Sequence, residues 1–229
     1  MIYSDRMRVF LHAMDGPDTP EGDGTPDFGQ MRIDAENSDI PIIRKEMESF
    51  LRVLLELAAP RTILEVGTAV GYSAQWMACC RQEADITTIE NYPPRLEAAR
   101  INIAASPYRE RITLIEGDAA QVLAHLTGQY DFIFMDAAKA QYLHFLPDAL
   151  KLLRTGGVLV SDNVLQDGVI LESHYAVERR DRTIYRRMRE YLRVLKQTDG
   201  LVTSIVPVGD GAAVTIKDKD NISIRTDMK

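Results

Sequence analysis

The stretch TILEVGTAVGYS (residues 62–73) joins a short apolar run to a turn that carries two glycines. The run at residues 62–66 has the length and the branched aliphatic residues of a buried strand. The residues after Tyr72 have a helical composition, so the glycines mark a tight turn between strand and helix. A strand, a tight turn and a helix form the first half of a βαβ unit. This stretch therefore predicts the start of a parallel sheet.

The same alternation continues on both sides of this stretch. Before it, apolar residues at intervals of three and four predict a helix that starts near Ile42 and ends before Pro60. After it, segments of helical length separate further strand-like runs, which is the pattern of a parallel sheet with helices on both faces. These runs lie at residues 86–89, 112–115, 132–135 and 157–160.

The order of elements changes toward the C-terminus. A long helix is expected from about residue 177 to 197, and two strand-like runs follow at 201–206 and 212–216. Only a short connection joins these two runs, so they must pair antiparallel. The predicted fold is α/β and Rossmann-like, with a mostly parallel seven-stranded sheet and an antiparallel C-terminal strand pair. In such sheets, ligands bind at the carboxyl ends of the strands.

The composition is that of a globular protein. Of the 229 residues, 45% are hydrophobic and 27% are charged, and no apolar run approaches the length of about 18 residues that a membrane span needs. The N-terminus carries charges where a signal peptide would be apolar, so we expect a cytoplasmic protein. The only cysteines are Cys79 and Cys80, which argues against a disulfide framework.

The first 40 residues differ from the remainder of the chain. They hold nine acids and three arginines and account for most of the net charge of −7. Residues 15–27 are dense in Pro, Gly and Asp, which predicts a loop or linker. We therefore divide the chain into an N-terminal helix with an acidic linker, residues 1–40, and one folded domain, residues 41–229. Because the remainder is nearly balanced in charge, the acidic total does not exclude a polyanionic partner.

The glycine turn lacks the features of the common phosphate-binding loops. Counted from Gly67, the second and third glycines of the dinucleotide motif G-x-G-x-x-G are replaced by Ala69 and Tyr72. No P-loop lysine follows. The turn keeps the pattern E-x-G-x-x-x-G, in which Glu65 ends the strand and Gly67 allows a ligand to approach the backbone.

Acidic residues also follow the next two strands. Glu90 ends the second strand, where a carboxylate can accept hydrogen bonds from both hydroxyls of a ribose. The third strand is followed by Asp118 and Ala119, and an acid there could meet an adenine edge. Each acid alone is a weak signal of a binding site. Together with a loop that lacks phosphate ligands, they favour a cationic nucleoside, S-adenosylmethionine (SAM).

A different set of polar residues follows the fourth and fifth strands. Asp136 ends the fourth strand, with Lys139 three residues later, and Asp162 and Asn163 follow the fifth. Helix caps, turns and a solvated lysine are the ordinary alternatives. Because neighbouring strands lie about 5 Å apart, two carboxylates and an amide oxygen could also converge on one point. Hard oxygen ligands of this kind suit Mg²⁺, Mn²⁺ or another divalent ion.

Residues 42–170 resemble the metal-dependent class I SAM O-methyltransferases, the family of the catechol and caffeoyl-CoA O-methyltransferases. The resemblance rests on the pattern D-x-x-K-x-x-Y from Asp136 to Tyr142 and on the intervals of 26 and 27 residues from Asp136 to the next two polar positions. It implies metal ligation by Asp136, Asp162 and Asn163, and a general-base role for Lys139. The SAM-binding positions that it implies are Ile43, Glu65, Gly67, Thr68, Ser73, Glu90, Asp118, Ala119 and Asp136.

The chemistry of methyl transfer fits these residue types. A sulfonium gives up its methyl group by in-line displacement, so a deprotonated acceptor oxygen must be held close to the methyl carbon. Binding of two adjacent acceptor oxygens to a metal ion would fix this geometry and stabilise the oxyanion. Lys139 would take the proton. The sequence therefore predicts a SAM- and metal-dependent O-methyltransferase.

The long helix before the C-terminal strands carries a basic stripe. Its cations lie along one side of the helix, opposite Met188, Leu192 and other apolar residues. A solvated surface is one explanation, and a face that grips RNA phosphates is the other. The cations of this stripe are Arg182, Arg186, Arg189, Arg193 and Lys196.

This helix, together with residues 136–142, 161–165 and 209–217, resembles bacterial tRNA 5-hydroxyuridine methyltransferases more than plant or animal catechol enzymes. That resemblance implies conversion of 5-hydroxyuridine at the tRNA wobble position to 5-methoxyuridine, since the base offers the same adjacent oxygens as a catechol. An unpaired base is also easier to bring to a metal. A small catechol-like or hydroxycinnamoyl acceptor is the alternative, and non-catalytic SAM or tRNA binding is a third hypothesis. Relatives are commonly dimeric, so we expect a homodimer.

Overall fold

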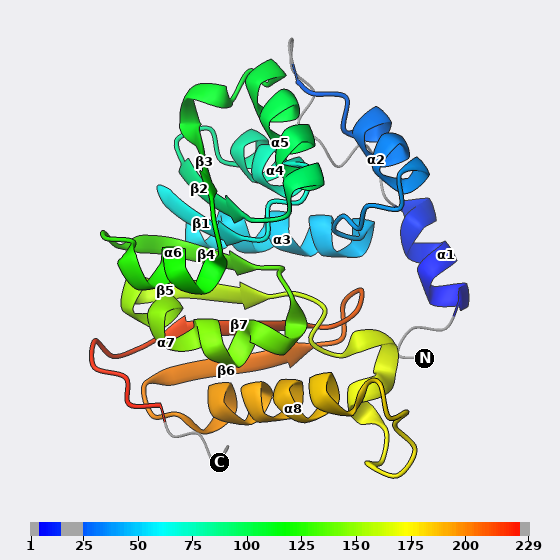
Figure 1. Cartoon of the computed structure of the whole chain (residues 1–229), viewed down its shortest axis with the longest axis vertical. Helices are drawn as coiled ribbons and strands as arrows, with labels where there is room; N and C mark the ends of the chain where they lie inside the picture. The colour runs from blue at the N-terminus through cyan, green and yellow to red at the C-terminus, as the bar shows by residue number, and fades with distance from the viewer. Residues whose placement is uncertain (1–4, 15–24, 225–229) are drawn as a thin grey trace.

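The computed structural model describes residues 5–14 and 25–224 of the chain. They form one sheet with the strand order β3-β2-β1-β4-β5-β7-β6 (Figure 1). β1 to β5 run parallel, and β7 pairs antiparallel with β5 and with β6. The expected Rossmann-like α/β fold is therefore confirmed. The strands are β1 (Thr62–Val66), β2 (Asp85–Glu90), β3 (Ile112–Glu116), β4 (Tyr130–Met135), β5 (Leu153–Ser161), β6 (Leu201–Val206) and β7 (Ala212–Lys217).

Helices cover both faces of this sheet. One layer consists of α6, α7 and α8, which lie in front of the sheet in the view of Figure 1, and the other contains α3, α4 and α5. The helices are α1 (Asp5–Met14), α2 (Phe28–Asn37), α3 (Lys45–Ala58), α4 (Tyr72–Cys80), α5 (Pro93–Ala105), α6 (Ala119–His125), α7 (Tyr142–Leu152) and α8 (Arg182–Gln197). Short 3-10 helices are η1 (Arg109–Arg111), η2 (Lys139–Gln141) and η3 (Gln166–Leu171).

The core divides into two apolar layers because successive strand residues point to opposite faces. Ile63 packs with the α3–α5 layer and Leu64 with the α6–α8 layer, and both side chains are completely buried. Phe132 and Ile133 repeat this alternation on β4. Since both faces are covered, the parallel strands are rich in buried aliphatic and aromatic residues, and many of the polar residues collect at their carboxyl ends.

The strand order places a topological switch point beside β1. The chain passes from β1 outward through β2 to β3, and then returns to place β4 on the other side of β1. Helices that follow β1 and β4 therefore leave on opposite faces, and a crevice opens between the carboxyl ends of these strands.

Some elements differ from the expectations. α8 begins at Arg182 rather than near residue 177, because Val177 is buried as part of a preceding turn. β5 begins at Leu153, earlier than the predicted run at residues 157–160. Its pairing with β4 shifts register between Tyr130 and Phe132. The sequence did not predict α2, whose Phe28 packs edge-on against the ring of Tyr72.

Residues 15–24 of the expected linker lie outside the described part of the chain. No helix within the described residues is both long enough and apolar enough to cross a membrane.

Candidate active site

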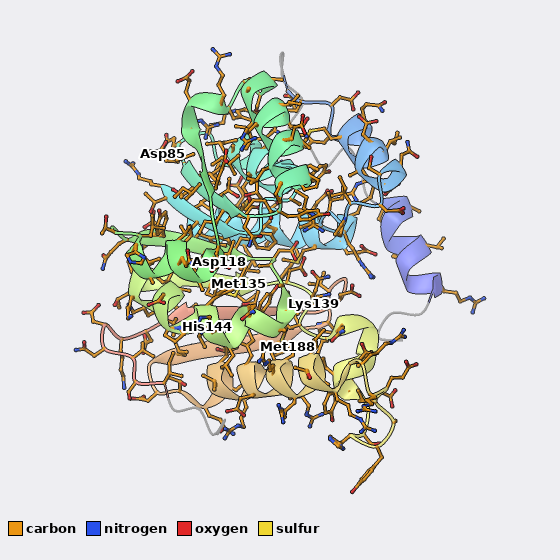
Figure 2. All side chains as sticks on the ribbon, in the orientation of Figure 1. Asp85, Asp118, Met135, Lys139, His144 and Met188 are labelled. Atoms are coloured by element: carbon orange, nitrogen blue, oxygen red, sulfur yellow. The ribbon has the colours of Figure 1, made fainter. Side chains whose placement is uncertain are left out.

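A cavity of about 750 Å³ lies at the carboxyl ends of β1 to β5. Its walls include residues 41–44 before α3, the helix η2 and the turn between β6 and β7. Figure 2 labels two of its lining residues, Asp118 and Lys139, together with Met135 at the end of β4. The predicted site residues that line it are Ile43, Gly67, Thr68, Ser73, Glu90, Asp118, Ala119, Asp136, Lys139, Asp162 and Asn163.

The glycine turn brings the end of β1 close to the end of β4. Gly67 has a φ of +107°, and its N–H donates to the carbonyl of Ile89 at 3.0 Å. A Cβ atom at Gly67 would lie 2.1 Å from the carbonyl oxygen of Asp136. Only glycine permits both this backbone conformation and this close approach. The cofactor turn and the first predicted metal ligand are therefore in direct backbone contact.

Glu90 is held at the cavity wall by the backbone. Its Oε2 accepts a hydrogen bond from the N–H of Ala69 at 2.9 Å. Its Oε1 accepts from the N–H groups of Asn91 and Tyr92 at 2.9 and 3.0 Å. A carboxylate has about four acceptor positions and three are occupied, so Oε2 of Glu90 can still accept one hydrogen bond, from a ribose hydroxyl.

Glu65 is the one predicted SAM-binding residue that does not line the cavity. Its side chain is fully buried, the hydroxyl of Thr88 donates to its Oε2 at 2.5 Å, and its Oε1 has no hydrogen-bond partner among the described atoms. Burial raises the pKa of Glu65 to about 7, although the nearby hydroxyls of Ser73 and Thr88 lower it. An unsatisfied buried oxygen can be satisfied by a donor on a ligand, and the role of Glu65 stays a prediction.

Two further predicted SAM positions are fixed by contacts with the backbone. Oδ1 of Asp118 accepts from the N–H groups of Ala120 and Gln121 at 3.1 and 3.2 Å and so caps α6. The cap sets the position of Ala119, the first residue of α6, in the cavity wall. Ile43 is buried, and its carbonyl accepts a hydrogen bond from Arg32 at 3.0 Å.

The ends of β4 and β5 bring Asp136 and Asp162 into the same cavity. The N–H of Asp136 donates to the carbonyl of Val66, and that of Asp162 donates to the carbonyl of Met135, both at 3.0 Å. These bonds continue the pairing of β4 with its two neighbours by one residue. The N–H of Asn163 donates to Oδ1 of Asp162 at 2.7 Å. The structure therefore gathers the three predicted metal ligands at one edge of the sheet.

The electrostatics of this cluster favour a cation. Burial raises the pKa of both Asp136 and Asp162, and the negative charge of Asp136 raises that of Asp162 further. Lys139 acts in the opposite direction on both carboxyls. In the described part of the chain, no three His, Cys, Asp or Glu side chains form a metal site by themselves. The predicted donor set consists of the carboxylates of Asp136 and Asp162 and the amide oxygen of Asn163, and oxygen donors of this kind fit a hard divalent cation.

The pattern D-x-x-K-x-x-Y divides into a cavity residue and a structural residue. Lys139 begins η2 and lines the cavity. Tyr142 is completely buried, and its hydroxyl lies 3.1 Å from the carbonyl oxygens of both Met135 and Asp162. Tyr142 therefore holds the ends of β4 and β5 together, which fixes the spacing of the two aspartates.

The basic stripe of α8 lies outside this cavity and in large part serves the fold. Arg182 and Arg189 donate to the carbonyls of Val177 and Ile170, at 3.3 and 3.0 Å. Arg193 forms an ion pair with Glu190 at 2.7 Å. Among the described residues, Arg186 is exposed and makes no ion pair. The stripe itself is confirmed as one face of an amphipathic helix whose other face is buried.

Asp210 and Arg44 line the cavity, and the sequence did not single them out. Asp210, in the turn between β6 and β7, accepts from Nδ2 of Asn163 at 3.2 Å and forms an ion pair with Arg44 at 2.6 Å. The only sequence signal is the Gly-Asp-Gly segment 209–211, which is also an ordinary turn sequence.

Comparisons with known proteins agree with this geometry. Residues 30–218 match the family model described as O-methyltransferase. A catechol O-methyltransferase of Niastella koreensis is 35% identical over 130 residues, which are 55% of this chain and 59% of that enzyme. The chain thus spans less than two thirds of the length of this relative. A protein of Mycolicibacterium vanbaalenii, provisionally named an O-methyltransferase, is 31% identical over 180 residues, 74% of each chain.

A solved structure extends the likeness over almost the whole chain. A Staphylococcus aureus protein, provisionally described as a caffeoyl-CoA O-methyltransferase, superposes with a TM-score of 0.81 at 28% identity. The superposition covers 93% of this chain and 98% of that one.

Proposed function

Since the chain belongs to the O-methyltransferase family, we propose that it transfers the methyl group of SAM to an acceptor oxygen with the help of a divalent cation. The observation that carries this proposal is the meeting of two kinds of site in one cavity. Asp136 and Asp162 enter it from β4 and β5, and Glu90 and the turn at Gly67 enter it from β2 and β1. A nucleoside pocket and a set of hard oxygen ligands are the two requirements of this reaction.

The residues of the cavity divide the work between them. Glu90 accepts a hydrogen bond from a ribose hydroxyl of SAM. Asp136, Asp162 and Asn163 would hold the cation, which would act as a Lewis acid that favours the acceptor oxyanion. Lys139, on η2 beside Asp136, takes the proton of the acceptor as general base.

We propose an acceptor with two neighbouring oxygens. A small catechol-like acceptor is supported by the relative from Niastella koreensis, which is a catechol O-methyltransferase. The base 5-hydroxyuridine in tRNA is the second candidate, supported by the exposed Arg186 on α8. That helix packs against η2, where Arg187 donates to the carbonyl of Ala140 at 3.1 Å, so a polyanion on α8 would lie near Lys139.

Metal dependence is tested by removing the cation. The protein is dialysed against EDTA and then assayed with SAM and a catechol, with and without added Mg²⁺ or Mn²⁺. We expect loss of turnover and its return with the metal, while binding of S-adenosylhomocysteine (SAH), measured by calorimetry, persists. Full activity of the metal-stripped protein would contradict metal dependence, and absence of SAH binding would contradict the cofactor site.

The acceptor is tested with Arg186→Ala. If tRNA is the substrate, its methylation falls and depends less steeply on salt, because a phosphate contact is lost, while turnover of a free catechol is unchanged. Arg189 is less suitable because it also holds the carbonyl of Ile170. The matched control is Arg61→Ala, an exposed arginine before β1. Equal methylation of tRNA by the variant and the control would remove the argument for RNA.

We also propose that the protein is a cytoplasmic homodimer. Light scattering coupled to size-exclusion chromatography tests the oligomeric state, and fractionation of cells tests the location.

A further inference from the structure

The turn between β6 and β7 is fixed against the segment that follows β5. The N–H of Val164 donates to the carbonyl of Gly211 at 2.9 Å, and that of Leu165 donates to the carbonyl of Asp210 at 2.8 Å. Gly211 has a φ of +86°, and a Cβ atom there would lie 2.3 Å from Cγ of Leu165. The backbone on both sides is therefore locked, and Asp210 keeps a defined place beside Asn163.

Asp210 connects two walls of the cavity. Its Oδ2 accepts a hydrogen bond from Nδ2 of Asn163 at 3.2 Å and pairs with Nη2 of Arg44 at 2.6 Å. Asp210 is 8% exposed and the Arg44 side chain 41% exposed, so water screens the contact with Asn163 less than it would at the surface and partly screens the pair with Arg44. Asn163 lies with Asp136 and Asp162, the other two proposed metal ligands, at what we call the metal end of the cavity. Arg44 belongs to the segment 41–44, which lines the same cavity next to the buried Ile43.

The contact with Asp210 selects one orientation of the Asn163 amide. A carboxylate only accepts hydrogen bonds, whereas an amide has a donor nitrogen and an acceptor oxygen. With Nδ2 directed to Asp210, Oδ1 of Asn163 is left for another partner, and oxygen is the atom that a hard cation binds. Residues that orient a metal ligand in this way typically change metal affinity about 10- to 100-fold when they are removed.

We propose that Asp210 is a positioning residue for Asn163, and that its ion pair with Arg44 makes metal binding and cofactor binding cooperative. This inference rests on the proposed function. Cofactor that binds against the segment 41–44 restricts the motion of Arg44. Arg44 then stabilises the position of Asp210 through their ion pair, and Asp210 orients the Asn163 amide through its hydrogen bond, with the amide oxygen available to the metal. By thermodynamic linkage, the metal then increases the affinity for the cofactor by the same factor.

The test measures Mn²⁺ binding by calorimetry in the presence and absence of SAH, without any turnover. In the unaltered protein, we expect SAH to tighten Mn²⁺ binding by about 5-fold or more. In Arg44→Met, this factor should approach one, while Mn²⁺ affinity without SAH changes little. Asp210→Ala should weaken Mn²⁺ binding about 10- to 100-fold even without SAH. Asp210→Asn, which can still accept from Asn163, should retain more affinity than Asp210→Ala and lose the coupling.

Two exposed ion pairs outside the cavity provide matched controls. Arg61→Met removes the partner of Glu83, and Asp199→Asn weakens the pair with Lys219. Both should leave Mn²⁺ affinity and its coupling to SAH unchanged, and thermal melts check that each variant is folded. If Asp210→Ala does not fold, Arg44→Met and Asp210→Asn still decide the question.

The two proposals fail in different ways. Coupling of unaltered size in Arg44→Met, or Mn²⁺ affinity within twofold of normal in Asp210→Ala, would overturn the positioning role and leave the proposed function intact. An unaltered protein that binds SAH but no Mn²⁺ would overturn the metal-dependent function itself.

Discussion

The cavity has a cofactor end, with Glu90 and Asp118, and a metal end, with Asp136 and Asp162. These two ends hold their acidic side chains in different ways. At the cofactor end, backbone N–H groups satisfy the carboxylates of Glu90 and Asp118. At the metal end, Asp136 and Asp162 are held in one buried cluster, and burial raises the pKa of both. The first arrangement is suited to neutral hydroxyl groups, and the second to a cation. Stability and function therefore agree for Glu90 and Asp118 and oppose each other for Asp136 and Asp162.

Asp162→Asn tests the metal end and should have the largest effect. We expect loss of Mn²⁺ binding and a fall in kcat/KM of about 100-fold or more, because a Lewis acid contributes several kcal/mol. Without metal, the variant should nevertheless melt at a higher temperature at pH 7 than the unaltered protein without metal. The reason is that a buried carboxyl with a raised pKa is replaced by a neutral group. The control is Asp85→Asn at the exposed start of β2. A lower melting temperature for Asp162→Asn would contradict the inference that the buried carboxyl of Asp162 lowers the stability of the metal-free protein.

Gly67→Ala tests the contact between the two ends. Because its Cβ atom would meet the Asp136 carbonyl at 2.1 Å, we expect a loss of about 3 to 5 kcal/mol in the free energy of unfolding, with weaker binding of both SAH and Mn²⁺. Gly128→Ala is the matched control, since Gly128 also has a positive φ, +102°, but no neighbour within 4 Å of the added atom. Denaturant unfolding compares them, and equal losses would show that backbone strain alone matters.

Glu90→Ala tests the cofactor end and should have the opposite sign to Asp162→Asn. Three backbone N–H groups lose their acceptor, so the free energy of unfolding should fall by about 1 to 3 kcal/mol, and SAH should bind more weakly. Glu90→Gln keeps one acceptor oxygen and should lose less. Stabilisation by Glu90→Ala would show that the carboxylates lower the free energy of unfolding at both ends of the cavity.

Glu65→Gln replaces an acid that does not line the cavity, and its effect on stability is read from its pH dependence. Burial raises the pKa of Glu65 from 4.5 to about 7 in the folded state. Between these values the folded protein holds a proton that the unfolded chain has released, so stability falls as the pH rises. The variant removes this loss, and its free energy of unfolding should exceed that of the unaltered protein by about 3 kcal/mol at pH 8 and hardly at all at pH 4. An equal difference at both pH values would contradict the raised pKa.

Most of the sheet could be predicted because each strand is a short apolar run between polar segments. The predicted run at residues 62–66 coincides with β1, and the antiparallel pairing of β6 with β7 followed from their short connection. The start of α8 could not be predicted, because residues 177–181 (VERRD) contain no Gly or Pro that would end a helix, and only tertiary packing places Val177 in the core. α2 was missed for a similar reason, since its weakly periodic sequence gains stability by packing Phe28 on Tyr72.

The site was predictable where each residue directly follows a strand. Gly67, Asp136 and Asp162 do so, Glu90 is the last residue of β2, and parallel strands bring residues at these positions to one edge. Asp210 was not predictable in this way, because it follows an antiparallel strand and lies 47 residues from its partner Asn163.

The sequence by itself determined the order of strands and helices, the glycine turn and the identity of the residues at the strand ends, because these depend on local periodicity and backbone freedom. Only the tertiary structure decided which residues face the cavity and which are bound elsewhere. Glu65 is fully buried and does not line the cavity. The hydroxyl of Tyr142 contacts the carbonyls at the ends of β4 and β5, and Asp210 contacts both Arg44 and Asn163. These outcomes depend on contacts between distant segments and on burial, which no local pattern contains.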